Sequence, residues 1–400
     1  MGYNSYSSRR GGGSASRGQH FGPPRRPKMR KGAQYIDPAR FVKAAKEVIE
    51  SEAFVPLHVF DDFAVEEVIK QNLAGKGYVA PSPIQDQTIP LGLEGKDVIG
   101  IANTGTGKTA AFAVPVLQKL MKTSGSKALI IAPTRELAQQ IEQEFRSIGK
   151  GSGLFGTLLI GGANIVPQLR DLKQNPEIVI GTPGRIKDHI ERRTLNLAQF
   201  NVVVLDEVDR MLDMGFINDV REILNSLAPE RQSFFFSATM EPKVKSLIET
   251  FSHEPVTVTV KTGETSESVH QDVVSFNGRE DKMAKLHDLL LQSDIKAIVF
   301  DETQRNVEKL SNELVARGFS ADAIHGGKSQ GQRQRALDKF KKNQVKILVA
   351  TDVAARGIDV IDITHVINYT QPNSYEDYVH RIGRAGRAGR VGYALTFVER

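Results

Sequence analysis

The chain has 400 residues and a formal net charge of +6, and it contains neither cysteine nor tryptophan. Without cysteine it can form no disulfide, thiolate metal site or cysteine nucleophile, while its length is sufficient for two domains, each with its own core. No apolar run approaches the roughly 20 residues of a membrane-spanning helix, and no secretory signal is recognisable, so we expect a soluble cytoplasmic protein.

The positive charge is concentrated in an N-terminal tail. Residues 1–40 hold nine Lys and Arg side chains against one acid, Asp37, whereas the remainder has a formal balance of −2. Residues 1–34 are rich in Gly, Ser, Arg and Pro, a composition that buries too little apolar area to fold, so we expect disorder. The tail is either a solubilising leader or a non-specific RNA-binding arm, and its composition does not separate the two.

A short lead-in follows over residues 35–59. Asp37 and Pro38 have the form of a helix N-cap followed by proline at the first helical position. The apolar residues from Phe41 to Ile49 recur with helical spacing. The segment is therefore predicted to be an amphipathic helix whose apolar face packs on the body of the protein.

Residues 60–260 alternate strand-like apolar runs with helical patterns such as Arg135–Ile148 and Phe216–Leu227. The runs are Val98–Ile101, Ala128–Ile131, Thr157–Ile160, Ile178–Ile180, Val202–Leu205 and Ser233–Phe236. This alternation predicts an α/β domain with a mostly parallel sheet and helices on both faces.

A second alternation fills residues 269–400, after a polar segment at 261–268 that is predicted to be a linker. Its strand-like runs are Val269–Phe276, Ala297–Phe300, Ala323–His325, Lys346–Ala350, Val366–Asn368 and Tyr393–Phe397. In both halves the unusual polar residues follow strand ends, which is where open α/β sheets bind ligands. No further pattern follows the last strand, so we expect no accessory C-terminal module.

The stretch Val98–Phe112 reads VIGIANTGTGKTAAF, an apolar strand, a turn of small residues and the start of a helix. Glycines let backbone N–H groups approach a polyphosphate, and the helix N-terminus adds a partial positive charge. Lys108 is placed to reach the β- and γ-phosphates and Thr109 to bind Mg²⁺. The general pattern has glycine where this chain has Ala102. A glycine-rich turn without a ligand is the alternative, which the complete Gly-Lys-Thr ending disfavours.

The acidic motif Asp206-Glu207-Val208-Asp209 follows the apolar strand Val202–Leu205. Beside a phosphate loop, Asp206 is placed to hold Mg²⁺ and Glu207 to orient and deprotonate the attacking water. A solvated acidic loop is the alternative.

Two motifs of the second half carry arginine. In HRIGRAGR, Arg381 and Arg384 are three residues apart and would share one face if the segment is helical. A guanidinium placed on the phosphoryl group in the transition state is worth about 10³–10⁵-fold in rate. A basic helix end facing solvent or RNA is the alternative. TDVAARGID adds Asp359, a candidate ribose acceptor, and Arg356, for which a structural ion pair stays open.

Together the motifs are similar to those of a known family. GYVAPSPIQ, ANTGTGKT, PTRELA, GG, TPGR, DEVD, SAT, IVFDET, TDVAARGID and YVHRIGRAGR occur in this order from about residue 60 to residue 400. In these motifs the chain resembles the DEAD-box RNA helicases, which also have alanine at the position of Ala102. The resemblance implies two tandem RecA-like domains that close on ATP, Mg²⁺ and single-stranded RNA, which is bound largely without regard to sequence.

The resemblance also implies roles for individual residues. The catalytic positions are Lys108, Asp206, Glu207, Arg381 and Arg384, and the metal ligands are Thr109 and Asp206. The nucleotide-binding positions are Phe60, which stacks on the base, Gln85, which reads the adenine edge, the loop Thr104, Gly105, Thr106, Gly107, Lys108 and Thr109, and Asp359. The RNA-binding positions are Thr134, Arg135, Gly162, Thr182, Arg185, Thr303, Gln330, Arg333 and Thr351. Asp209, Ser237, Thr239 and His380 are implied to couple hydrolysis to strand separation.

The sequence departs from the family pattern at two places. Val208 replaces an alanine in the acidic motif, and we expect ATP hydrolysis to survive because neither carboxylate changes. Gly327-Lys328 replaces an acid and an apolar residue, which weakens the assignment of Gln330 and Arg333 to RNA. Two other functions stay open: an RNA clamp or chaperone that acts by binding and annealing, and a DNA-directed motor of the same superfamily. We expect a monomer.

Overall fold

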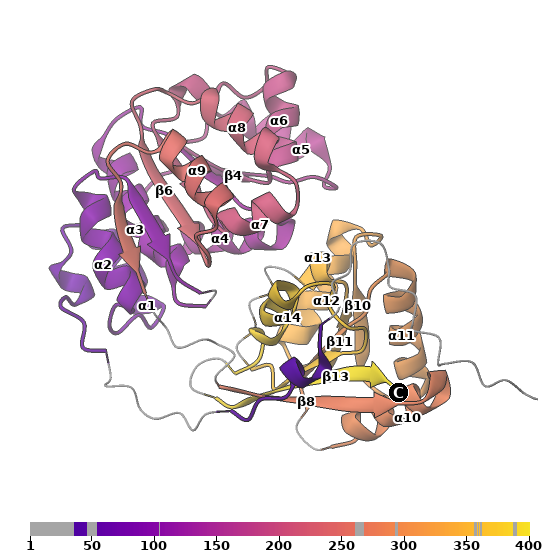
Figure 1. Cartoon of the computed structure of the whole chain (residues 1–400). Helices are drawn as coiled ribbons and strands as arrows, with labels where there is room; N and C mark the ends of the chain where they lie inside the picture. The colour runs from indigo at the N-terminus through magenta and orange to yellow at the C-terminus, as the bar shows by residue number, and fades with distance from the viewer. Residues whose placement is uncertain are drawn as a thin grey trace, which may run out of the picture. The chain divides into compact units, whose positions relative to one another are not determined.

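The computed structural model describes residues 36–45, 54–103, 105–260, 268–292, 295–355, 358, 360, 362–386 and 390–400. The predicted tail and nearly all of the predicted linker lie outside these residues. The described chain contains two parallel sheets with their helices, here called the first and second domains (Figure 1). No helix among the described residues is long and apolar enough to cross a membrane.

The first domain is built on a seven-stranded sheet of order β3-β4-β2-β5-β6-β1-β7, in which every neighbouring pair is parallel. Its strands are β1 Val98–Ile101, β2 Ala128–Ile131, β3 Gly156–Leu159, β4 Ile178–Gly181, β5 Val202–Leu205, β6 Gln232–Ser237 and β7 Val256–Thr259. Its helices are η2 Phe60–Asp62, α1 Glu67–Gly75, α2 Pro83–Leu93, α3 Lys108–Lys122, α4 Arg135–Ile148, α5 Ile165–Leu172, α6 Pro183–Glu191, η3 Leu197–Gln199, α7 Val208–Asp213, α8 Ile217–Asn225 and α9 Pro242–Phe251.

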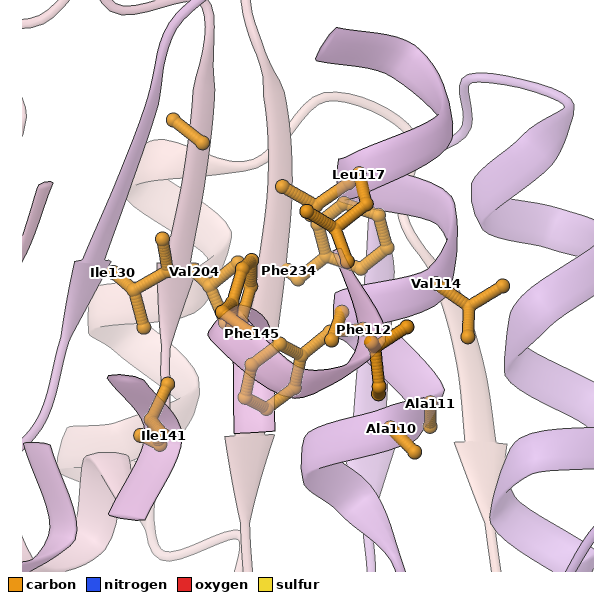
Figure 2. Close-up of a cluster of buried hydrophobic side chains, with 14 of the residues drawn as sticks. Ala110, Ala111, Phe112, Val114, Leu117, Ile130, Ile141, Phe145, Val204 and Phe234 are labelled. Atoms are coloured by element: carbon orange, nitrogen blue, oxygen red, sulfur yellow. The ribbon is translucent and has the colours of Figure 1, made fainter. Parts of the chain in front are cut away.

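Alternate residues of each strand enter different cores on the two faces of this sheet. Ile130 and Val204 belong to the cluster that contains residues of α3 and α4, whereas Leu129 and Val203 belong to the cluster with residues of α8 and α9. Figure 2 shows the first of these cores, where Phe112 of α3 lies beside Phe145 of α4 with ring centroids 6.0 Å apart. Because both faces are covered, ligands have access to this sheet at the ends of its strands.

The second domain has a six-stranded, all-parallel sheet of order β10-β11-β9-β12-β13-β8. Its strands are β8 Val269–Phe276, β9 Ala297–Phe300, β10 Ala321–Ile324, β11 Ile347–Ala350, β12 His365–Asn368 and β13 Gly392–Glu399. Its helices are α10 Gly278–Leu290, α11 Gln304–Ala316, α12 Gln330–Lys341, α13 Asp352–Ala355 and α14 Tyr375–Ile382. The predicted fold class, two tandem α/β domains with parallel sheets, is confirmed.

The lead-in corrects one expectation. A 3₁₀ turn, η1 Pro38–Phe41, begins after the predicted N-cap Asp37, but the chain is extended from Val42 and Lys43 pairs antiparallel with Gln271 of β8. A helix over residues 42–45 is therefore wrong, because pairing with a sheet edge replaces the local helical bonds. Residues 46–53 lie outside the described part of the chain. We call residues 36–45 the strap.

Candidate active site

Strand order brings three sequence motifs to one rim of the first sheet. β5, β6 and β1 are consecutive neighbours and parallel, so the loops that follow them leave the sheet side by side. These loops are the phosphate loop after β1, the acidic motif after β5 and the Ser237-Ala238-Thr239 motif after β6. The phosphate loop, the acidic motif and the Ser237-Ala238-Thr239 motif therefore share one edge of the sheet.

The phosphate loop has the backbone that its glycines predict. Gly105 and Gly107 have φ values of 85° and 90°, in the left-handed region that other residues rarely adopt. A Cβ atom at Gly107 would also lie 2.4 Å from Nε2 of Gln85. Lys108 is buried at the first position of α3, and its Nζ donates to the carbonyl of Ala102 at 3.0 Å. Thr104 lies outside the described residues.

Gln85 is fixed against this loop. Its Oε1 accepts from the Ser82 N–H at 2.9 Å and its Nε2 donates to the Gly107 carbonyl at 3.1 Å. Ser82 Oγ donates to the Thr106 carbonyl at 2.7 Å. The amide oxygen can accept two hydrogen bonds and the amide nitrogen can donate two, so each atom of Gln85 can still make one hydrogen bond to a base edge.

Phe60 lies at the edge of the first core rather than in the open. It is 6% exposed, and its ring meets Phe63 and Tyr78 edge-on, with centroids 5.9 and 5.6 Å away. Little of the ring is free to cover a base in this arrangement. Base stacking by Phe60 therefore stays a prediction.

The two carboxylates that are predicted to be catalytic, Asp206 and Glu207, are both buried. Asp206 is 2% exposed, and burial raises the pKa of its carboxyl to about 6, against the opposing effect of the Lys108 ammonium. Glu207 has a left-handed backbone, φ 55°, which is uncommon outside glycine and asparagine. Its Oε2 accepts from Arg210 Nη1 at 2.9 Å, whereas its Oε1 is buried without a hydrogen-bond partner. An orphaned carboxylate oxygen here fits a group that receives a proton from a bound water.

Asp209 joins the acidic motif to the next loop. Its Oδ2 accepts from the backbone N–H groups of Ala238 and Thr239, both at 3.0 Å, and from Thr239 Oγ1 at 3.3 Å. The Asp209 N–H donates to Ser237 Oγ at 3.4 Å. A movement of either loop is therefore transmitted to the other.

Val208 is fully buried in the apolar cluster on the face of the sheet that α8 and α9 cover. Its two extra methyl groups add to that core and are accommodated there. The departure from alanine thus changes packing under α7 and leaves the carboxylates of the motif intact.

The predicted RNA-binding residues of the first domain gather around one loop. A Cβ atom at Gly162 would lie 2.1 Å from Arg135 Nη1, so that guanidinium rests directly on the glycine. Arg185 Nη1 donates to the carbonyl of the next residue, Ala163, at 3.4 Å. Thr134 and Thr182 are the N-caps of α4 and α6. Two cations and two helix N-termini at one rim suit phosphate groups.

The corresponding residues of the second domain follow adjacent strands. Thr303 caps α11 after β9, Gln330 and Arg333 lie in the first turn of α12 after β10, and Thr351 follows β11. β10, β11 and β9 are consecutive in the sheet, so these loops share one rim.

Lys328, the second departure from the family pattern, is held by local ion pairs. Its Nζ lies 3.4 Å from Glu308 Oε2 and 3.5 Å from Asp322 Oδ1. Glu308 also meets His325 Nε2 at 2.8 Å. The lysine is therefore part of an ion-pair cluster within the second domain.

The position of Arg381 corrects its predicted role. It is 3% exposed, and its Nε and Nη2 bind both oxygens of Asp352, at 2.5 and 2.7 Å. Its Nη1 donates to the Thr370 carbonyl at 2.7 Å and to Asn368 Oδ1 at 3.2 Å. A guanidinium committed to four acceptors within its own domain is a structural group, because reaching a nucleotide would break these hydrogen bonds and the ion pair with the partly exposed Asp352.

The other described arginine of this motif is Arg384. Arg384 is also buried, and its Nη1 donates to the Ile358 carbonyl at 2.9 Å. It lines a small pocket with His380 and Asp377. Asp359, Arg356 and the last arginine of the motif, Arg387, lie outside the described residues.

The residues present fit a magnesium ion that is brought by a nucleotide. Among the described residues no group of three or more His, Asp or Glu side chains could hold a metal unaided. Thr109 and Asp206 supply one hydroxyl and one carboxylate beside the glycine cradle. Mg²⁺ is usually held by one or two protein oxygens together with substrate phosphates and water.

Two family models match the chain. The DEAD/DEAH box helicase model covers residues 82–247, and the helicase conserved C-terminal domain model covers residues 281–389. The ATP-dependent RNA helicase CshA of Listeria monocytogenes is 47% identical over 344 residues, which cover 85% of this chain and 66% of that protein. The DEAD-box ATP-dependent RNA helicase CshA of Bacillus subtilis is 47% identical over 343 residues, which cover 85% of this chain and 69% of that protein. The chain thus spans about two thirds of their length.

Solved structures of the same kind are similar in fold. S. cerevisiae Dbp5 bound to RNA and ADP BeF3 matches with a TM-score of 0.75 and 29% identity, covering 86% of this chain and 90% of that one. A DEAD box protein from the hyperthermophile Methanococcus jannaschii matches with a TM-score of 0.51 and 39% identity, covering 86% and 94%.

Proposed function

Because the chain belongs to the DEAD-box family of ATP-dependent RNA helicases, we propose that it hydrolyses ATP when single-stranded RNA is bound and locally unwinds or remodels RNA duplexes. The observation that carries this proposal is the rim of the first domain. There a glycine cradle with a buried lysine meets two buried carboxylates, one of which has an unpartnered oxygen.

In this proposal the first domain binds and orients the nucleotide. Lys108 leaves the Ala102 carbonyl for the β- and γ-phosphates, and Gln85 and Phe60 meet the base. Thr109 and Asp206 hold Mg²⁺, which when bound supplies positive charge to the phosphoryl oxygens. Glu207 uses its free oxygen to orient water and accept its proton, while Arg210 holds the other oxygen.

The second domain supplies further positive charge to the transition state of hydrolysis and one of the two RNA-binding rims. With Arg381 fixed to Asp352, Arg384 is our candidate among the described arginines for the transition-state charge. RNA is held through phosphate and sugar contacts that do not read sequence, by the two rims described above. Asp209, Ser237 and Thr239 relay the state of the nucleotide, and His380 completes that relay from the second domain.

Further parts of the proposal concern the whole chain. We place the nucleotide-binding domain at residues 60–260, the linker at 261–268 and the second domain at 269–400, and we propose a monomeric protein that acts in the cytoplasm. The similarity of curated RNA helicases supports RNA over DNA as the partner. An RNA clamp that acts by annealing alone is disfavoured by the buried carboxylate pair, which binding does not require.

The assignment of Glu207 is tested by Glu207→Gln. The amide keeps the size of the side chain but cannot accept the water proton, so ATP should bind with nearly unchanged affinity while turnover falls by about 10²–10⁴-fold. Nucleotide binding by equilibrium titration and phosphate release with RNA present measure the two quantities. Brisk hydrolysis by this variant would refute the role given to Glu207.

A further inference from the structure

The strap lies before the first domain in sequence but packs on the second domain (Figure 1). Phe41 is fully buried, and its ring packs at a tilt of 55° against Tyr378 of α14, with centroids 4.7 Å apart. The Arg40 guanidinium covers Tyr375 of the same helix, 3.8 Å from its ring centroid. The strap therefore covers the tyrosine-bearing face of α14.

Backbone pairing fixes the strap at the same place. Lys43 exchanges two hydrogen bonds with Gln271 of β8, at 3.0 and 2.8 Å, on an edge of the second sheet. The side chain of Gln271 in turn accepts from the Tyr378 hydroxyl at 3.0 Å. The strap, β8 and α14 thus form a closed set of contacts in which each element holds the other two.

α14 is the helix that leads into the arginine motif. Arg381, three residues after Tyr378, also holds the helix through the bidentate pair with Asp352. His380 lies on the helix and Arg384 directly follows its C-terminus. The orientation of the His380 and Arg384 side chains therefore depends on the position of α14 on the sheet. The Asp352 pair and the strap both contribute to holding α14 in this position.

We propose that the strap is a positioning element for ATP hydrolysis, which acts by holding α14 and hence Arg384 and His380 in place. Phe41 is the principal positioning residue and Arg40 the secondary one. The inference rests on the proposed function of these second-domain residues in the reaction. It makes turnover depend on a segment that contributes no group to the nucleotide site.

The test compares Phe41→Ala and Phe41→Leu with Val42→Ala in the full chain. Val42 is the adjacent strap residue and is 57% exposed, so it is a matched control of similar chemistry. Phe41→Ala should lower kcat of RNA-stimulated ATP hydrolysis at least about tenfold with KM for ATP nearly unchanged. Phe41→Leu should recover part of the loss, and Val42→Ala should match the natural chain. All rates are measured well below each variant's unfolding temperature.

Arg40→Ala provides a second variant that leaves the core intact. Losing an exposed cation–π contact predicts a fall in kcat of about two- to fivefold, again without a change in KM. A purely structural strap would lower the unfolding temperature of Phe41→Ala while leaving kcat of the folded protein unchanged, and this result would overturn the inference. A rise in KM alone would do the same. Absence of RNA-stimulated hydrolysis in the natural chain would instead refute the proposed function.

Discussion

Arg381 and Arg384 belong to the same sequence motif but have different roles in the molecule. From their spacing in the motif alone, both arginines are predicted to contact the phosphoryl group in the transition state. The structure separates them, because Asp352 neutralises Arg381 within the second domain. The ion-pair partner of Arg381 lies 29 positions earlier in the sequence, so the local spacing of the motif could not reveal this ion pair.

The structural role of Arg381 predicts a loss of stability. Arg381→Lys cannot keep both hydrogen bonds to Asp352, whose side chain is partly exposed, and losing a hydrogen bond to a charged group costs about 1.5–3 kcal/mol. We expect a lower unfolding temperature than for the exposed control Arg221→Lys, measured by thermal denaturation without nucleotide. A variant with natural stability and strongly reduced kcat would restore Arg381 as a transition-state group.

Asp206 predicts the opposite change in stability. Its pKa in the folded protein is raised by burial to about 6, so its favourable contribution is present below the ordinary value of 3.8 and is lost as pH rises through 6. Without nucleotide, Asp206→Asn should therefore raise the unfolding temperature by at least about 2 °C near pH 7.5, and by less near pH 5. Hydrolysis should be abolished. An unfolding temperature lowered at the higher pH would contradict this account of the charge.

At the scale of elements, strands and the phosphate loop were predictable and long-range pairing was not. β1, β2, β5 and β9 have the predicted bounds because continuous apolar runs determine buried parallel strands, and β8 also has its predicted bounds. β7 was missed because only one of its four residues is buried, so its sequence VTVT has no apolar run. The strap was wrongly predicted to be helical because the spacing of its apolar residues carries no information about pairing with β8, more than 200 residues away.

The candidate site was predictable to a similar degree. The cradle glycines, Lys108 and the two carboxylates come from contiguous motifs whose backbone is set locally, so their juxtaposition followed from strand order. Contacts between distant motifs were implied only by resemblance, and of these the Asp209 link to the loop after β6 is present. The partners of Arg210, Lys328 and Arg381 were not foreseen, since an ion pair needs tertiary structure to be recognised.

At the scale of the whole molecule, the second domain is built from two segments of the sequence that are separated by the first domain. The strap belongs to the second domain, the next elements build the first, and the sequence then returns to the second at β8. Two separate segments of the sequence, residues 46–59 and 261–268, therefore connect the same pair of domains. A ligand that bridges both domains is favoured by such tethering, because each connection raises the effective concentration of one domain near the other.

The central claim is that RNA and ATP act on this chain as coupled ligands, so that bound RNA accelerates hydrolysis and each ligand tightens the other. Its most direct test is the steady-state rate of ATP hydrolysis by the full chain with single-stranded RNA, with single-stranded DNA of equal length and with neither, at two salt concentrations. The account predicts strong stimulation by RNA, weak stimulation by DNA and a low rate without nucleic acid. Equal rates in all three conditions would contradict it.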